Sequence, residues 1–327
     1  MPVAANSKWR MNLAVAAMVW TTIVLMAGLL GNWMGFGGRR FAMALGVAAV
    51  LFAFEWFLSA PGVQEFARLF LRGRGALLSS LLPLLAVLVY SFGVSGRLLL
   101  GIAGAAYAVL PALLLAGSSG KTAGLWEDYV AAVVLWVPVQ FHWMYRLFPF
   151  PPPLTHTLSI VMALSTAVAA FLLVRRLPEV GYTVEWRAGF GWSFAFNYTV
   201  FALIAIFLGV RIGFLVFAPS LHRGVPLPLA ALGILFFTAW PEEFLFRGVL
   251  QNLLTQTLKN EWAALAAASV IFGLSHLHHA PYPNWKYALL ATIAGLFYGH
   301  AWMKTRSLVP GVLVHAAVDI SWHILFR

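Results

Sequence analysis

The sequence contains no cysteine, which excludes disulfides, thiol nucleophiles and cysteine-ligated zinc or iron–sulfur sites. Charge is also scarce, since only 9% of the 327 residues are Asp, Glu, Lys or Arg. In a typical soluble domain these four residue types make up about 25% of the chain. Hydrophobic residues make up 62% of the chain. Together these proportions exclude a soluble globular protein and predict a protein embedded in a membrane.

Long apolar runs dominate what remains, and each is close to the length that crosses a bilayer as a helix. The runs lack the short alternating pattern of a membrane β-barrel. We therefore predict an all-α fold, a polytopic membrane helical bundle with about 8–11 transmembrane helices. As a separate expectation, we place this integral multi-pass protein in the plasma membrane of a prokaryote. The candidate spans lie near residues 11–31, 41–60, 76–94, 98–116, 129–148, 156–174, 193–217, 227–253, 262–278, 286–303 and 309–326.

The net charge of +11 has a simple explanation in a membrane protein. Basic residues gather in short loops between apolar runs, as at Arg39–Arg40 and Arg175–Arg176, where they are expected beside anionic lipid headgroups. The bilayer is therefore the expected partner of these cations, and no nucleic-acid partner is predicted.

The longest polar stretch, residues 175–187, suggests a division of the chain. We expect an N-terminal multi-span membrane region of unknown role over residues 1–190. The functional region is expected over residues 191–327, with its motifs concentrated in residues 225–327.

Acidic residues inside apolar runs are the first functional signal, because there are only ten acids in the chain. A charge at the bilayer centre costs about 3 kcal/mol on insertion scales, so such residues need partners or a function. Glu55, Glu242, Glu243 and Asp319 lie in such runs. Glu55 has no other motif residue near it, and we expect a lone acid that reaches the interface or finds one basic partner.

The segment "WPEEFLFRG" (240–248) pairs two of these acids with an arginine. On a helix, Glu243 and Arg247 are four residues apart and their side chains meet. Arg247 stays charged, so it is expected to hold Glu243 as a structural carboxylate. Glu242 points about 100° away on an α-helix and is left available as a general base.

Two further apolar segments carry histidines. His276 ends the apolar run "WAALAAASVIFGLSH", and His315 lies four residues before Asp319 on one helix face, where the carboxylate can orient the imidazole. Two uses fit these residues. Either Glu242 activates water directly with His276, or one divalent metal, most plausibly zinc, is held by some of Glu242, His276, His315 and Asp319.

The three motifs, in this order, resemble those of the CPBP family of intramembrane proteases, which includes the CAAX prenyl proteases and bacteriocin-processing enzymes and is also called the Abi family. The resemblance covers roughly residues 225–327. The matching motifs are Glu242-Glu243-x-x-x-Arg247, Phe272-x-x-x-His276 and His315-x-x-x-Asp319.

The resemblance implies an endopeptidase that hydrolyses a peptide bond of a membrane-associated protein, or of one tagged at its C-terminus or leader. It implies Glu242 as the base, His276 positioning the water, and His315 with residue 319 stabilising the oxyanion or ligating a metal. Prenyl-protein-processing members tend to carry Asn at the last position. Asp319 cannot donate a hydrogen bond unless protonated, which favours an orienting or ligating role for it.

Three alternatives remain open. Nine histidines and "HLHHA" invite comparison with membrane di-iron enzymes, but those need several His boxes and give the Glu–Arg motif no role. Buried acids could also serve a proton- or ion-coupled transporter. A non-catalytic scaffold or immunity protein of the same family is the third, because family membership does not prove cleavage.

Overall fold

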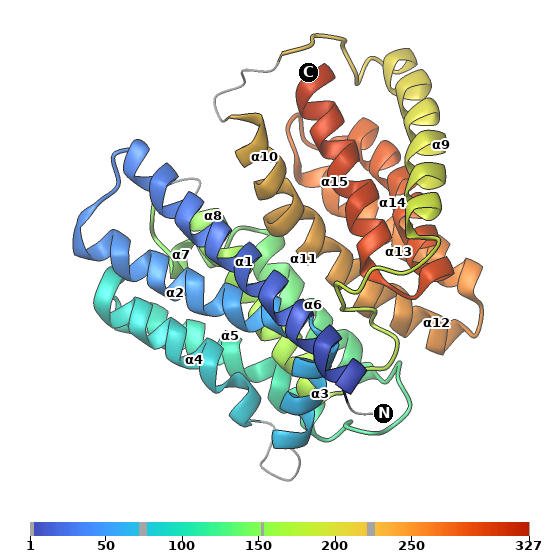
Figure 1. Cartoon of the computed structure of the whole chain (residues 1–327). Coiled ribbons are helices and arrows are strands. Elements are labelled where there is room, and N and C mark those ends of the chain that lie inside the picture. Colours follow the sequence, from blue (N-terminus) through green and yellow to red (C-terminus); the bar gives the residue numbers. More distant parts are fainter. Residues whose placement is uncertain (1–2, 72–76, 152–153, 221–225, 327) are drawn as a thin grey trace. The chain divides into compact units, whose positions relative to one another are not determined.

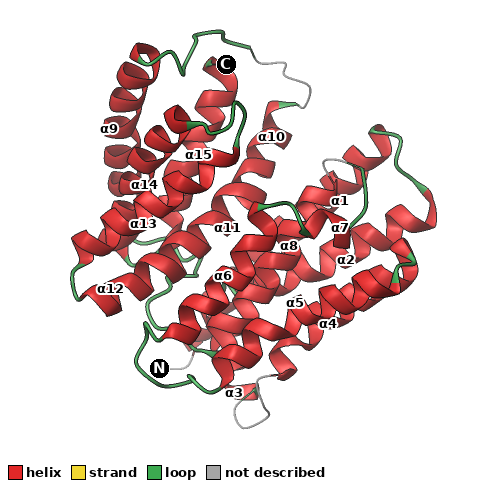
Figure 2. Cartoon of the chain, turned by 180° about the vertical axis from the view of Figure 1, so that it is seen from behind, coloured by secondary structure: helices red, strands yellow, loops and turns green. Residues whose placement is uncertain are grey.

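The computed structural model describes residues 3–71, 77–151, 154–220 and 226–326. Within these ranges every extended regular element is a helix and no strand is present (Figure 2). Eight of the described helical segments are long and apolar enough to cross a membrane. They confirm the predicted all-α polytopic bundle. The eight are Leu13–Trp33, Gly38–Phe57, Leu78–Ser95, Leu98–Ala116, Leu154–Val174, Phe190–Arg211, Leu227–Leu258 and Leu308–Leu325.

The predicted span at 129–148 is wrong as a single helix. Helix α6 ends at Gln140, two residues after Pro138, and a turn follows in which His142 has a positive φ of 58°. The short helix α7 then covers Met144–Leu147. The predicted spans at 262–278 and 286–303 are helices, but they are not among the eight candidate membrane spans.

The chain forms two compact units. Unit 1 comprises Met1–Leu177 with Thr183–Glu185, and unit 2 comprises Pro178–Tyr182 with Trp186–Arg327. The assignment of separate roles to residues 1–190 and 191–327 remains a prediction.

Unit 1 contains the first eight helices. Their bounds are α1 Val3–Trp33, α2 Gly38–Phe57, α3 Pro61–Phe70, α4 Leu77–Tyr90, α5 Leu98–Ala116, α6 Trp126–Gln140, α7 Met144–Leu147 and α8 Leu154–Val168. Helices α4 and α8 continue into π-helical segments at Ser91–Ser95 and Ala169–Val174.

A buried ion pair anchors unit 1. The Nε atom of Arg175 lies 2.6 Å from Oδ1 of Asp128, and both side chains are buried. The arginine also donates to the carbonyls of Lys121 and Thr122, so its charge is fully engaged. This corrects the expectation that Arg175 faces lipid headgroups.

Glu55 is buried in α2 instead of reaching the interface. Its carboxyl accepts a hydrogen bond of 3.1 Å from the Ser165 hydroxyl on α8. The expectation that Glu55 reaches the interface is therefore wrong. Its carboxyl stays inside unit 1, where the hydroxyl of Ser165 on a neighbouring helix donates to it.

Unit 2 contains the other helices and all the motif residues. Their bounds are α9 Phe190–Arg211, α10 Leu227–Ile234, α11 Trp240–Glu243, α12 Asn252–Leu258, α13 Glu261–Ser275, α14 Trp285–Thr305 and α15 Leu308–Leu325. Helix α14 packs against α9, α13 and α15 (Figure 1). The contact with α13 is close because residue 295 is glycine, where a Cβ atom would lie 3.0 Å from the Cα atom of Ser269.

Candidate active site

The first motif lies in a single helical run from Leu227 to Leu258 whose geometry changes along its length. Helices α10, α11 and α12 alternate with π-helical segments at Leu235–Ala239 and Phe244–Gln251. Pro241 lies just after the first π-helical segment and has no N–H to give to the preceding turn. Such segments re-aim side chains and are frequent at functional sites.

The predicted pair of Glu243 and Arg247 is present. The Nε atom of Arg247 lies 3.3 Å from Oε2 of Glu243, and both side chains are buried. The guanidinium also donates to the carbonyl of Gly295 at 3.4 Å. Its Cζ atom lies 4.5 Å from the ring centroid of Phe272, so an aromatic face covers the charge.

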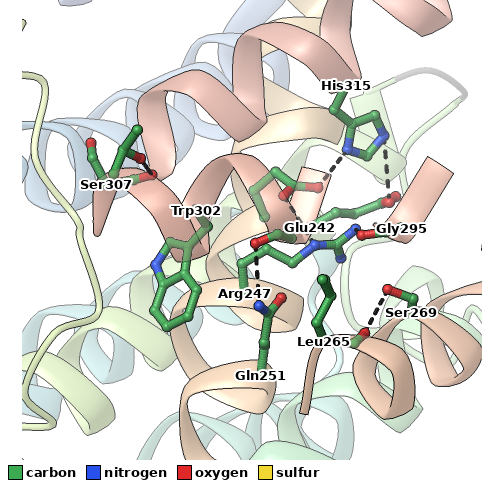
Figure 3. A network of polar contacts seen from close by, with 12 residues as sticks. Glu242, Arg247, Gln251, Leu265, Ser269, Gly295, Trp302, Ser307 and His315 are labelled. Carbon is green, nitrogen blue, oxygen red and sulfur yellow. Dashed lines mark hydrogen bonds and ion pairs between the residues drawn. The ribbon is translucent and has the colours of Figure 1, made fainter. Parts of the chain in front are cut away.

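His315 links both glutamates to α15. Its Nδ1 donates to Oε1 of Glu243 at 2.9 Å. Its Nε2 faces Oε2 of Glu242 at 3.8 Å (Figure 3). The same atom lies 3.6 Å from Oδ2 of Asp319. Tyr298 stacks on the imidazole with ring centroids 4.6 Å apart. The ring is therefore fixed by Glu243 on one side and open to two carboxylates on the other.

The orienting partner differs from the expectation. We expected Asp319 to orient His315 through the i,i+4 spacing, but 3.6 Å is longer than a hydrogen bond. Glu243 holds that position, across 72 residues of sequence. Glu243 thus has two polar partners, Arg247 and His315, of which the spacing in the sequence indicated only Arg247.

The carboxylates differ in what can reach them. The side chain of Glu243 is fully buried, whereas 33% of Glu242 and 28% of Asp319 is exposed. Within the described part of the chain, Oε2 of Glu242 has no hydrogen-bond partner. This oxygen is itself buried, so Glu242 is an available acceptor beside His315, while other atoms of its side chain are exposed.

His276 follows α13 at the start of the short 3₁₀ turn His276–His278, outside the eight candidate spans. Its Nδ1 donates to the carbonyl of Phe272 at 2.8 Å, which leaves the Nε2 lone pair available. Burial lowers the pKa of His276 to about 4, so the ring is neutral at pH 7. Across the described residues no hydrogen bond or ion pair joins His276 to Glu242.

A metal ion needs several ligating side chains around one point. In the described ranges no group of three or more His, Asp or Glu side chains is arranged to hold a metal ion. Nδ1 of His315 is used on Glu243 and Nδ1 of His276 on the Phe272 carbonyl, so each ring keeps only Nε2 for a ligand. The expected ligands were some of Glu242, His276, His315 and Asp319, and as placed these side chains do not form a three-ligand set.

Two tyrosines beside the motifs were not identified from the sequence. Tyr298 stacks on His315, and Tyr287 lies against His276 with ring centroids 4.6 Å apart. Both are on α14, which carries none of the three motifs. A tyrosine in an apolar helix gives no signal of its own, so only the packing of α14 shows these contacts.

Comparison with known proteins defines the class of this region. Residues 224–321, which contain all three motifs, match the family model of the type II CAAX prenyl endopeptidase Rce1-like proteins. This region is therefore similar to the CAAX protease family, as the motifs indicated, and it lies in an integral multi-pass membrane protein. The match covers 98 of 327 residues. No curated protein and no solved structure matches the chain.

Proposed function

We propose that the protein is an intramembrane endopeptidase that hydrolyses a peptide bond with water activated by Glu242. The observation that carries this proposal is the arrangement at His315. One nitrogen is fixed by the buried Glu243, and the other faces the partly exposed Glu242 and Asp319. A positioned base beside an oriented imidazole is what hydrolysis of an amide requires.

In the proposed reaction, Glu242 accepts a proton from water, and the resulting hydroxide adds to the scissile carbonyl carbon. Nε2 of His276 accepts a hydrogen bond from the second O–H of that water and so aligns it. The tetrahedral intermediate then collapses, the C–N bond breaks, and the proton on Glu242 passes to the leaving nitrogen.

The other motif residues hold these groups in place. Glu243 fixes the His315 ring, and Arg247 balances the buried charge of Glu243. In its cationic form His315 also donates from Nε2, toward the oxyanion or the leaving amine. Asp319 lies 3.6 Å from Nε2 and can accept from it. No step is assigned to a metal, because the donor set does not fit one.

The proposed substrate is a membrane-associated protein cut near a terminal tag. The family description favours a prenylated C-terminus, and a leader peptide is the second class to test. A panel of detergent-solubilised peptides separates these classes, with a farnesylated C-terminal peptide, its unprenylated counterpart and a set of leader peptides.

The test compares wild-type protein with Glu242→Gln on that panel. We expect cleavage by wild type and its loss in Glu242→Gln. Glu179→Gln is the matched control, because Glu179 is a largely exposed acid of the same unit and should leave cleavage unchanged. Equal cleavage by wild type and Glu242→Gln would contradict the assigned base. Absence of cleavage by wild type would favour a non-catalytic scaffold.

A further inference from the structure

Amide hydrolysis places negative charge on the carbonyl oxygen, and enzymes stabilise it with fixed hydrogen-bond donors. The motif residues offer few such donors. Glu242 and Asp319 are carboxylates, and the Nδ1 proton of His276 is used on the Phe272 carbonyl. Arg247 is buried and turned toward Glu243 and Gly295. His315 donates from Nε2 only as a cation, and two carboxylates then compete for that proton.

Tyr287 is a donor beside these groups that no motif includes. Its ring meets His276 at 4.6 Å between centroids and Trp322 at 5.2 Å, so it bridges the end of α13 and helix α15. Trp322 lies one helical turn after Asp319 on α15. The side chain of Tyr287 is partly exposed, and its hydroxyl has no hydrogen-bond partner among the described residues.

The backbone around Tyr287 is fixed to the loop that follows His276. The N–H of Tyr287 donates to Oδ1 of Asn284 at 3.0 Å, which caps α14. Asn284 donates in turn from Nδ2 to the carbonyl of Ala280 at 3.1 Å and from its N–H to that of Leu277. Tyr287 and His276 are thus held together by one cap, as a preorganised donor requires.

The electrostatic setting keeps the phenol protonated. Helix α14 is outside the eight candidate spans. Burial, and then the charges of Asp319 and Glu242, raise the pKa of Tyr287 above its ordinary value. At pH 7 the group is therefore a donor, and it lies near the two carboxylates that flank His315.

We propose that Tyr287 is a further catalytic residue, whose hydroxyl donates a hydrogen bond to the scissile carbonyl oxygen and to the oxyanion that forms from it. The inference rests on the proposed function. Tyr298 is less suited to this role, because it is 2% exposed and its ring is occupied in stacking on His315.

Tyr287→Phe tests the proposal, because it removes one hydroxyl and keeps the ring contacts. Removal of one oxyanion donor lowers kcat about 10²–10³-fold, and we expect that loss with KM little changed. A phosphinic analogue of the cleaved peptide, which mimics the tetrahedral intermediate, should bind more weakly, with the uncleaved peptide bound as before. Tyr282→Phe is the matched control, because Tyr282 is exposed and should keep wild-type kinetics.

Each outcome decides the matter. Wild-type kcat in Tyr287→Phe, with Glu242→Gln inactive, would overturn this inference and leave the proposed function standing. A loss of kcat in Tyr287→Phe with unchanged affinity for the phosphinic analogue would also overturn it, since the hydroxyl would then act only on structure. No cleavage by wild type would overturn the proposed function and this inference together.

Discussion

At the scale of residues, Glu242 and Glu243 are chain neighbours in different environments. Glu243 is fully buried between Arg247 and His315, whereas a third of Glu242 is exposed. Burial of a charge is tolerated when partners surround it, and exposure is needed where water must arrive. The environment of Glu243 therefore suits a structural role, and that of Glu242 suits the proposed role of a base.

Glu243→Gln should destabilise the protein by about 3–5 kcal/mol, because it leaves the buried Arg247 charge unpaired. Thermal unfolding in detergent measures this, with Glu242→Gln as the control that keeps near wild-type stability. In the double variant Glu243→Gln/Arg247→Met we expect stability to return and cleavage to stay low, because His315 still lacks its carboxylate. An unfolding temperature in Glu243→Gln equal to that of wild type would contradict the pairing as a source of stability.

Chelation should leave cleavage intact, because the motif side chains do not form a three-ligand set. The measurement is the metal content of the purified protein, with activity before and after treatment with 1,10-phenanthroline. Stoichiometric zinc that leaves together with activity would contradict this expectation, and would make Glu242, His276, His315 and Asp319 ligand candidates again.

Local spacing made some residue contacts predictable. Four residues on a helix bring Glu243 to Arg247, and the structure has that pair. The bond from His315 to Glu243 joins α15 to α11 across the fold, so no local rule indicates it. Local spacing also indicated Asp319 beside His315, and the structure has the two groups 3.6 Å apart, as an ion pair and not as a hydrogen bond.

At the scale of elements, close packing of α15 on the first motif controls the site. A Cβ atom at Gly311 would lie 3.1 Å from Oε2 of Glu243 and 3.1 Å from the carbonyl of Tyr298. Helix α15 can approach the glutamate because residue 311 has no side chain. The glycine therefore allows the approach of the helix that carries His315 to Glu243.

Gly311→Ala should destabilise the protein by about 1–3 kcal/mol, as overpacking of a well-packed contact does, and should lower kcat by displacing His315. The control is Gly233→Ala on α10, where a Cβ atom would meet nothing within 4 Å. There we expect unchanged or slightly raised stability, because alanine favours a helix. Unfolding temperature and kcat measured for both variants decide this, and equal behaviour of the two would contradict the account.

Helix positions followed from apolar length, but their internal geometry did not. The run predicted at 227–253 is helical and extends to Leu258. Its π-helical segments were not foreseen, because they depend on packing as well as on Pro241. The end of α6 at Gln140 was not predicted for a similar reason. The apolar run continues past Gln140, but the backbone turns there.

At the scale of the whole molecule, all motif residues belong to unit 2, and unit 1 has its own buried polar contacts. Composition, with the length and pattern of the apolar runs, predicted the all-α membrane bundle, since lipid permits few other folds. The role of unit 1 could not be predicted, because its sequence carries no motif that points to a chemistry.

Asp128→Asn in unit 1 should lower the stability of the protein and leave the reaction in unit 2 unchanged. It weakens the buried pair with Arg175, so we expect a lower unfolding temperature. Below that temperature, kcat on a short peptide should equal that of wild type, because no proposed catalytic group is in unit 1. A reduced kcat in the folded variant would show that unit 1 contributes to the reaction.

The most direct measurement of the central claim is cleavage in H₂¹⁸O by purified wild type and Glu242→Gln, with products read by mass spectrometry. The account predicts that wild type yields two fragments, and that the fragment with the new C-terminal carboxylate carries ¹⁸O. It predicts that Glu242→Gln, with an unfolding temperature equal to that of wild type, yields no fragments. Fragments with ¹⁸O from Glu242→Gln at the wild-type rate would contradict Glu242 as the base that activates water.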